Sequence, residues 1–565
     1  MEKFSEFCYK RPNYDEVKKQ MRARIEELKI ADAKLTVTLA EELNLLNSEI
    51  NSQQIISNIR HSIDITDTFY NEENDYWNEY APLYEELITD YYRGVLASPH
   101  QEVLRTTFPA TFFLIAENQL KTFSPAIIEL SQTENNLISR YEKILATAEV
   151  EFNNEKMPLP KLGPFYQSPD RHVRQAADQV RSHFFASKEI ELDEIYDSLV
   201  KVRTSMAKEL GYPDYVAMGY DMMNRFDYDR NMVESYRKEI LSQVVPLTQK
   251  LYKRQAERLG LETLYHYDLP IEFSEGNAIP KGTAEEILDK GVTMYQELSP
   301  ETGEFMSQMM DRQLLDVLSK PGKQSGGYCD FIASYQAPFI FANFNGTSGD
   351  IDVLTHEAGH AFQVYQSRWI KEPECVFPTY ESCEIHSMSM EFFTWPWMHL
   401  FFEEQTEKYY YSHLSDAVEF LPYGVLVDHF QHEVYEHPEM TPQERKTTWR
   451  RLERMYCPER DYSHDNFLEK GTYWYRQGHI FASPFYYIDY TLAQVCAFQF
   501  WQKAYIEKDP CAWNDYMSIC KVGGTKTFLE IINLAKLNSP FEEGSLRKVM
   551  ETIDGYLSNI KDEVL

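Results

Sequence analysis

The stretch DIDVLTHEAGHAFQVYQSR, from Asp350 to Arg368, contains the pattern His-Glu-x-x-His, with His356 and His360 as its two histidines. Residues four apart on an α-helix share one face, one turn above the other. Both imidazoles could therefore bind one metal ion at about 2.0–2.1 Å. Glu357 lies beside the first histidine, where it could accept a proton from an attacking water. Gly359 would let another element approach this helix closely.

A third protein ligand is expected, because catalytic zinc sites usually combine three protein ligands with one position for water. The helical turns after His360 carry glutamines, so the ligand should come from another segment. The segment Thr379–Phe393 (TYESCEIHSMSMEFF) contains four candidates, namely Glu381, Glu384, His386 and Glu391. The pattern alone leaves Glu381 and Glu384 as alternatives. Asp352 and Glu391 could orient the imidazoles from behind or could be solvated acids.

Outward from this helix, the preceding segment Tyr335–Asn345 (YQAPFIFANFN) is short, aromatic and apolar, which is typical of a β-strand. Most of the chain has a helical pattern instead, as at Val17, Met21 and Ile25. We therefore expect a mostly α fold with a small sheet beside the histidine helix. Within the strand, Phe339–Phe344 could be an exposed edge that binds an extended peptide, or a buried strand.

The chain is expected to divide into two parts. Three prolines and a glycine interrupt the helical pattern between Phe152 and Phe165. A new helical run is predicted from about Glu191 to the stop signal Gly211-Tyr212-Pro213. The predicted division is an N-terminal helical lobe over residues 1–190 and a region carrying the metal site over residues 191–565.

Composition excludes several classes of protein. The chain has 565 residues, 43% hydrophobic and 26% charged, which is typical of a large globular protein and not of a disordered one. Its 56 basic and 89 acidic residues give a net charge of −33, which argues against nucleic acids and anionic membranes as partners. No apolar run approaches the ~20 residues that cross a bilayer, and the first residues do not resemble a secretory signal. Eight cysteines without a Cys-x-x-Cys pair predict reduced thiols and a cytoplasmic protein.

Several segments together resemble one known family. They are HEAGHAFQVY, ESCEIHSMSMEFF, Ile195–Tyr215, Asp428–Pro438 and Val522–Ile531. On these segments the chain resembles the thimet-oligopeptidase-type zinc metallopeptidases, in particular the oligoendopeptidase F and Pz-peptidase branch. The resemblance implies Glu384 as the third ligand, followed by Glu391 after seven residues, with Glu381 outside the site. It also implies one zinc ion per chain and a large multi-lobed helical metallopeptidase with a deep channel between lobes.

A hydrogen-bond donor is expected opposite the metal, because hydrolysis of an amide places negative charge on the carbonyl oxygen. The segment Gly478–Tyr490 (GHIFASPFYYIDY) is similar to the family's loop with a histidine and tyrosines. The resemblance implies that His479 and Tyr490 donate to this oxygen, with Tyr487 as the accessory donor and Tyr486 as its alternative. Without the resemblance, these residues would be interpreted as core aromatics in a chain with 39 tyrosines.

The predicted function is a zinc endopeptidase that cuts short, unstructured peptides, an oligopeptidase by resemblance. The alternatives are a catalytically silent peptide-binding protein on the same scaffold and a zinc hydrolase of another amide. The histidines of DHFQHEVYEH, namely His429, His432 and His437, could suggest a second metal site, but structural roles are favoured. The segments Pro321–Gly327 and Lys521–Thr527 fit no phosphate-binding motif, so nucleotide binding is not expected.

Overall fold

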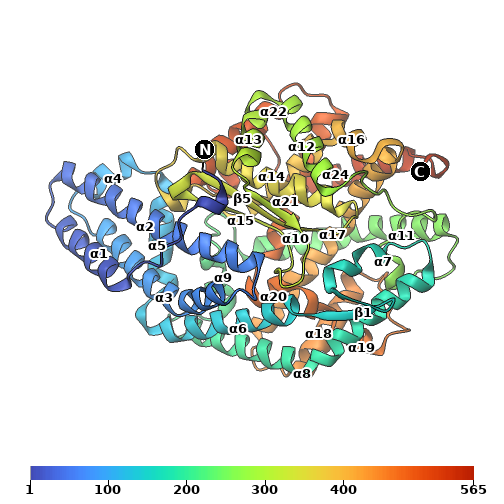
Figure 1. The fold of residues 1–565 in the computed structure, drawn as a ribbon, viewed down its shortest axis with the longest axis horizontal. Helices are drawn as coiled ribbons and strands as arrows, with labels where there is room; N and C mark the ends of the chain where they lie inside the picture. Colours follow the sequence, from blue (N-terminus) through green and yellow to red (C-terminus); the bar gives the residue numbers. More distant parts are fainter. Residues whose placement is uncertain (1) are drawn as a thin grey trace.

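The computed structural model describes residues 2–565 and shows an elongated, mostly helical protein, as predicted (Figure 1). The first helices lie together at one end of the molecule and share a hydrophobic core. Side chains cap their starts, because Asn13, Asp32 and Asp67 accept hydrogen bonds from first-turn amides. In chain order these helices are α1 (Tyr14–Leu28), α2 (Ala33–Ile63), α3 (Thr68–Leu96), α4 (Gln101–Thr107) and α5 (Ala110–Thr122). Helix α6 (Ile128–Ala146) follows, and its buried Leu137 and Tyr141 belong to the larger core of the rest of the molecule.

Helix α8 (Arg171–Glu209) is a single rod of 39 residues. The predicted helix start near Glu191 is wrong, because the helix already begins after Asp170, whose side chain caps it, and no proline or glycine interrupts it. The predicted stop is confirmed, since Gly211 follows the helix with a φ of 80°. The predicted division at residue 190 falls inside α8 and stays a prediction.

The proline-containing segment before α8 forms a small antiparallel hairpin. Its strands are β1 (Glu149–Phe152) and β2 (Glu155–Pro158), joined through Asn153 and Asn154. Both asparagines have positive φ, the backbone conformation that a tight hairpin turn requires. After the short helix α7 (Gly163–Tyr166), the chain enters α8.

The centre of the second half is α15 (Tyr380–Phe393), which packs against both α14 (Gly349–Ser367) and α21 (Tyr487–Trp501). Most side chains of α15 and α21 are buried, so neighbouring helices fix both of them in place. The other helices of this half are α9 (Tyr215–Met222), α10 (Arg230–Glu239), α11 (Val245–Leu259), α12 (Ala284–Leu298), α13 (Pro300–Asp311), α16 (Met398–Phe402), α17 (Thr406–Glu436), α18 (Pro442–Tyr456), α19 (Asn466–Glu469), α20 (Gly478–Ala482), α22 (Ala512–Val522), α23 (Phe528–Leu534) and α24 (Ser545–Asn559).

A three-stranded sheet precedes α14, as predicted. Its strands are β3 (Leu315–Leu318), β4 (Tyr328–Ile332) and β5 (Ala337–Phe344), in the order β3-β5-β4. Strand β5 is parallel to β3 and antiparallel to β4, so both of its edges are paired. The hypothesis that Phe339–Phe344 offers an edge to a peptide is therefore wrong, and the segment is the buried central strand. Strand β4 forms one outer edge of the sheet, and β3 forms the other.

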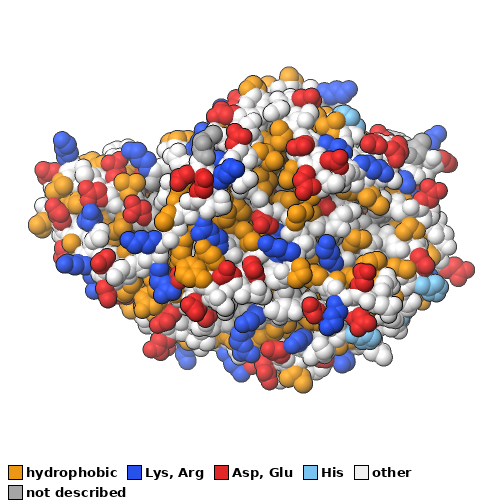
Figure 2. Space-filling view, viewed as in Figure 1, with side chains coloured by type: hydrophobic (Ala, Val, Ile, Leu, Met, Phe, Trp, Pro, Cys, Tyr) orange, Lys and Arg blue, Asp and Glu red, His pale blue; other side chains and the backbone are white. Residues whose placement is uncertain are grey.

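The surface carries acidic and basic side chains side by side, with hydrophobic groups gathered toward the middle of the face that Figure 2 shows. Over residues 2–565, no helix combines the length and the apolar composition that a bilayer crossing requires. All eight cysteines are free thiols.

Candidate metal centre

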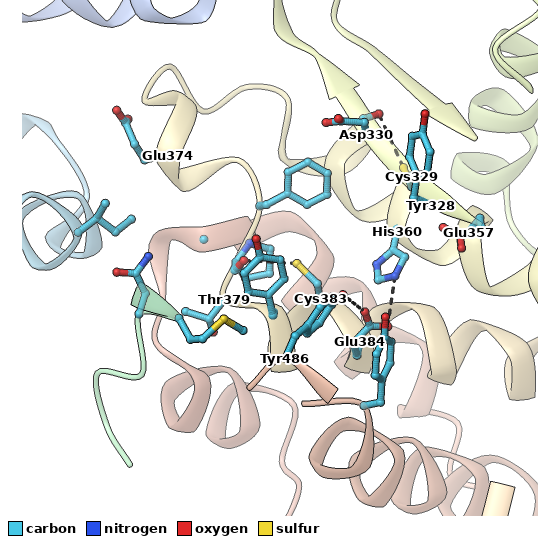
Figure 3. A pocket seen from close by; sticks show the side chains of 18 of the residues that line it. Tyr328, Cys329, Asp330, Glu357, His360, Glu374, Thr379, Cys383, Glu384 and Tyr486 are labelled. Atoms are coloured by element: carbon cyan, nitrogen blue, oxygen red, sulfur yellow. Dashed lines mark hydrogen bonds and ion pairs between the residues drawn. The ribbon is translucent and has the colours of Figure 1, made fainter. Parts of the chain in front are cut away.

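The two histidines of α14 and a glutamate of α15 meet at one point. Figure 3 shows two of these residues, His360 and Glu384. The Nε2 atom of His356 lies 3.1 Å from Oε2 of Glu384, and Nε2 of His360 lies 3.3 Å from the same oxygen. The centroids of the two imidazole rings are 5.0 Å apart. One nitrogen of each histidine and one carboxylate oxygen therefore converge in a space that a metal ion could occupy.

Gly359 explains how the two helices bring these side chains together. A Cβ atom at this position would lie 2.6 Å from Cα of Ser387 and 2.8 Å from the carbonyl oxygen of His386. Only glycine lets α14 and α15 approach this closely, which confirms the role predicted for it. Of the two glutamates left open by the pattern, Glu384 joins the histidines. Glu381 instead accepts a hydrogen bond from Oγ1 of Thr379 at 2.9 Å.

A second layer of hydrogen bonds orients the first histidine. Glu391 places Oε1 2.7 Å from Nδ1 of His356, as predicted, so the opposite ring nitrogen faces the cluster. The other oxygen of Glu391 lies 2.9 Å from Nε2 of His413, and His413 accepts a hydrogen bond from the indole of Trp395. Sequence analysis missed His413, because it belongs to α17 and no local pattern connects it with α14.

Asp352 has a different partner from the one predicted. Its Oδ1 accepts a hydrogen bond from the Tyr409 hydroxyl at 2.7 Å, and no hydrogen bond joins it to His356 or His360. Burial raises the pKa of Asp352 to about 6. Asp352 thus supports the start of α14 and does not orient the imidazoles.

The two glutamates beside the histidines, Glu384 and Glu357, have pKa values that are shifted in opposite directions. Burial raises the pKa of Glu384, but the adjacent imidazoles of His360 and His356 outweigh burial and hold this pKa well below its ordinary value. Burial raises the pKa of Glu357 above its ordinary value. The Oε2 atom of Glu357 is buried and has no hydrogen-bond partner among the described residues. Glu384 is therefore suited to hold a cation, and Glu357 to accept a proton.

Across the cavity, His479 and two tyrosines face the cluster. His479 Nε2 lies 3.1 Å from the hydroxyl of Tyr490, and the hydroxyl of Tyr486 donates to Oε1 of Glu384 at 2.5 Å. All three side chains line the same cavity as the metal cluster. Tyr487, the predicted accessory donor, lines an adjoining cavity that His479 and Tyr490 also line. The rings of Tyr487 and Tyr486 lie 4.9 Å and 5.5 Å from the ring of His479, so the choice between them as accessory donor stays a prediction.

Two residues that sequence analysis missed fix the state of His479. The hydroxyl of Tyr423 donates to Oε1 of Gln477 at 2.9 Å, so the amide group of Gln477 is left to donate to Nδ1 of His479 at 2.9 Å. Nε2 of His479 then carries the proton and can donate it in a hydrogen bond. Burial lowers the pKa of His479 to about 4, so the ring is neutral at pH 7.

The cavity has a volume of about 620 Å³ and lies between the two halves of the chain. Thr111 and Ile115 of α5 line it on one side, and β4 lines it with Tyr328, Cys329 and Asp330. Figure 3 shows His360, Glu384 and Tyr486 close together, with Glu374 at the opposite side. A cavity with walls from both halves can enclose an extended ligand of several residues.

The weaker signals of the sequence have structural explanations. His432 contacts the Tyr220 hydroxyl at 3.1 Å and the carbonyl oxygen of Asp428 at 3.0 Å. His429 and His437 do not join it in any candidate metal cluster of the described residues. In the glycine-containing segment near residue 524, a Cβ on Gly524 would lie 2.2 Å from the carbonyl oxygen of Phe377. Gly523 and Gly524 therefore allow this segment to pack closely against the backbone of Val376 and Phe377.

The chain is similar to several known proteins. A family model described as "Peptidase family M3" matches residues 165–551, and one described as "Peptidase M3 N-terminal domain" matches residues 4–123. An oligoendopeptidase F homolog from Borreliella burgdorferi is 24% identical over 435 residues, which cover 72% of this chain and 70% of that protein. A solved structure of PZ peptidase A with an inhibitor is 50% identical, covers 99% of this chain and 100% of its own, and superposes with a TM-score of 0.98. A structure provisionally described as oligoendopeptidase F, from Bacillus anthracis str. Ames, is 48% identical over the full length of both chains, with a TM-score of 0.94.

Proposed function

This chain belongs to peptidase family M3, and from that premise we propose that it is a zinc-dependent oligoendopeptidase that hydrolyses internal bonds of short, unstructured peptides. The observation that supports this most is the convergence of His356, His360 and Glu384 in a cavity that Glu357 and His479 also line. The free thiols favour the reducing cytoplasm as its location.

The residues of the cluster fit a zinc ion. Two imidazole nitrogens and one carboxylate oxygen form a donor set that zinc prefers, and three protein ligands leave a position for water or substrate. A zinc ion bound there would supply Lewis acidity toward water and the peptide carbonyl. His356 is held for this role by Glu391, and Glu384 by the hydroxyl of Tyr486.

Glu357 would move the proton during hydrolysis. Its unpaired Oε2 takes a proton from the attacking water, and the same carboxyl then gives that proton to the leaving amine. The proton is thereby conserved, the C–N bond breaks, and a carboxylate and an amine are released. Burial favours this cycle because it makes the carboxylate a stronger base.

His479 and Tyr490 would stabilise the charge that grows on the carbonyl oxygen, while the hydroxyl of Tyr486 beside them donates to Glu384. His479 is neutral with a proton on Nε2, and Tyr490 offers a hydroxyl. A single preorganised donor of this kind contributes about 3–4 kcal/mol to transition-state stabilisation in comparable sites.

The shape of the cavity favours an extended peptide as substrate. Strand β4 lines the cavity, and its outer edge is not paired within the sheet, so its backbone could bind a peptide as an added strand. Such binding would recognise the backbone of the peptide more than its side chains. A cavity of about 620 Å³ holds several residues and excludes a folded domain.

Replacing Glu357 by glutamine tests the chemistry. The variant should bind zinc and peptide as the wild type does, while kcat falls by about 10²–10⁴-fold. The readout is cleavage of quenched fluorescent peptides of different lengths, together with metal content and peptide affinity. A wild type that binds but never cuts peptides would instead be a silent binding protein. One that cuts only other amides would be a different hydrolase.

The assignment of Glu384 as the third metal ligand can be tested against Glu381, a control residue on the same helix. Replacing Glu384 by glutamine should abolish stoichiometric zinc binding, whereas the same change at Glu381 should leave one zinc per chain in this site. Both glutamates are buried on α15, so a general effect of burying an amide would affect both variants. Equal zinc loss in the two variants would refute the assignment.

A further inference from the structure

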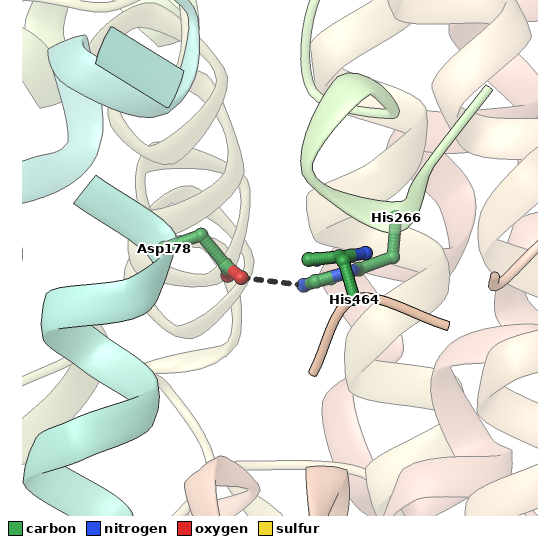
Figure 4. Close-up of side chains that lie close together, drawn as sticks. All are labelled: Asp178, His266 and His464. Atoms are coloured by element: carbon green, nitrogen blue, oxygen red, sulfur yellow. Dashed lines mark ion pairs between the residues drawn. The ribbon is translucent and has the colours of Figure 1, made fainter. Parts of the chain in front are cut away.

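Outside the central cavity, three potential metal ligands meet between α8 and two loops (Figure 4). They are Asp178 on α8, His266 in the turn after α11, and His464 in the loop between α18 and α19. One candidate ligand atom from each lies within 4.8 Å of the other two. The amide of His266 also donates to the carbonyl oxygen of Asp461 at 3.2 Å, so the two loops are joined directly.

The distances in this cluster resemble those of the first one. Nε2 of His266 lies 2.7 Å from Oδ2 of Asp178, and the rings of His266 and His464 have centroids 5.1 Å apart. The ring orientation differs, because these two rings are stacked with 10° between their planes, whereas the planes of His356 and His360 are 81° apart. Arg181 donates to the other oxygen, Oδ1 of Asp178, at 2.8 Å. As with Glu384, a neighbouring donor fixes one carboxylate oxygen and leaves the other facing an imidazole.

Three ring nitrogens at this point lack hydrogen-bond partners. They are Nδ1 of His266 and both nitrogens of His464, which are buried without a partner in residues 2–565, whereas Nε2 of His266 forms an ion pair with Oδ2 of Asp178. Buried polar groups are almost always satisfied, so this group of unpaired nitrogens indicates a missing ligand. A metal ion would satisfy one nitrogen of each ring and the carboxylate oxygen together.

Two arginines, Arg181 and Arg476, lie near the cluster and take up none of its imidazole nitrogens. The two guanidinium groups lie over tyrosine rings, at 3.8 Å for Arg476 and 4.1 Å for Arg181, and neither is hydrogen-bonded to an imidazole.

We propose that Asp178, His266 and His464 bind a second divalent transition-metal ion, of the zinc class, which fastens α8 to the two loops. Two imidazoles and one carboxylate suit zinc, cobalt or nickel, whereas calcium and magnesium prefer oxygen ligands throughout. The ion would have a structural role, because none of its three ligands lines the central cavity.

The test is metal stoichiometry in a background without the first site. The full chain with His356→Ala and His360→Ala is stripped with a chelator, loaded with Zn²⁺ or Co²⁺, and freed of excess metal by gel filtration. We expect two ions per wild-type chain, one in the background, and none when His464→Gln is added. His432→Gln is the matched control, since it changes another buried histidine outside any candidate cluster, and should keep one ion.

Folding and specificity are checked in the same samples. Circular dichroism and the Tm of each variant show whether it is folded, and Asp178→Asn repeats the test without changing a histidine. The Co²⁺ form of the background should show a visible absorption band and a raised Tm, both lost with His464→Gln. A background without bound metal would overturn the proposal, as would equal metal in the His464→Gln and His432→Gln variants. Because no step measures catalysis, this outcome is independent of the proposed peptidase activity.

Discussion

Replacing Gly359 by alanine should weaken metal binding more than it lowers stability. The new Cβ would lie 2.6 Å from Cα of Ser387, whereas ordinary contacts begin near 3.4 Å, so α14 and α15 must separate by about 0.8 Å. Glu384 and the two histidines lie on these helices, and metal sites tolerate only about 0.2 Å of error in ligand distance. We expect zinc affinity to fall by about 10–100-fold, the loss typical of disturbed ligand orientation.

The stability change should be smaller, because two effects oppose each other. Overpacking costs about 1–3 kcal/mol, while alanine gains about 1 kcal/mol over glycine within a helix. The assays are zinc competition with a coloured chelator and urea unfolding of the metal-free protein. Gly555→Ala on α24 is the control, because a Cβ there meets no atom within 4 Å. If Gly359→Ala bound zinc as tightly as this control, the argument that a glycine contact sets the ligand geometry would be refuted.

Three further predictions concern single side chains. Tyr486→Phe should lower kcat about 10–100-fold, since it removes the hydroxyl that donates to Glu384, while Tyr487→Phe should change kcat less than threefold; steady-state kinetics compare them, and the reverse order would favour Tyr487 as the accessory residue. His413→Gln should reduce zinc affinity about tenfold with little effect on kcat at saturating zinc, because it loosens Glu391 behind His356; unchanged affinity would contradict this support. Burial raises the pKa of Glu142 to about 7, so the folded state binds more protons than the unfolded state between about pH 4.5 and 7 and loses stability as pH rises through that window. Glu142→Gln should therefore raise the free energy of unfolding at pH 8 by about 1–3 kcal/mol and by much less at pH 5, and an equal change at both pH values in urea titrations would exclude ionisation as the cause.

Features set by local periodicity could be predicted from the sequence. The spacing of His356 and His360 fixes their common face whatever surrounds the helix, and Gly359 between them indicated a close neighbour. The choice between Glu381 and Glu384 needed the family resemblance. Their separation of three residues leaves both near one face of a helix, and only the position of α14 decides between them.

Features set by distant contacts could not be predicted. The apolar strand Ala337–Phe344 could have been an edge or a centre, and only pairing with β3 and β4 made it central. His413 and Gln477 act through partners on other elements, so neither has a local signal. The helix start at Arg171 was missed because charged residues obscure the apolar period there, although Asp170 is a recognisable cap.

The unbroken course of α8 limits how this enzyme could open and close. Near the end of the helix, Arg203 bonds to Glu134 of α6, to the Tyr435 hydroxyl of α17 and to the carbonyl oxygen of Phe481, two residues after His479. The helix has no proline or glycine, so it offers no hinge near residue 190. Any motion that opens the cavity to a peptide must therefore hinge elsewhere, and a tilt of α8 would move α20, which carries His479, with it.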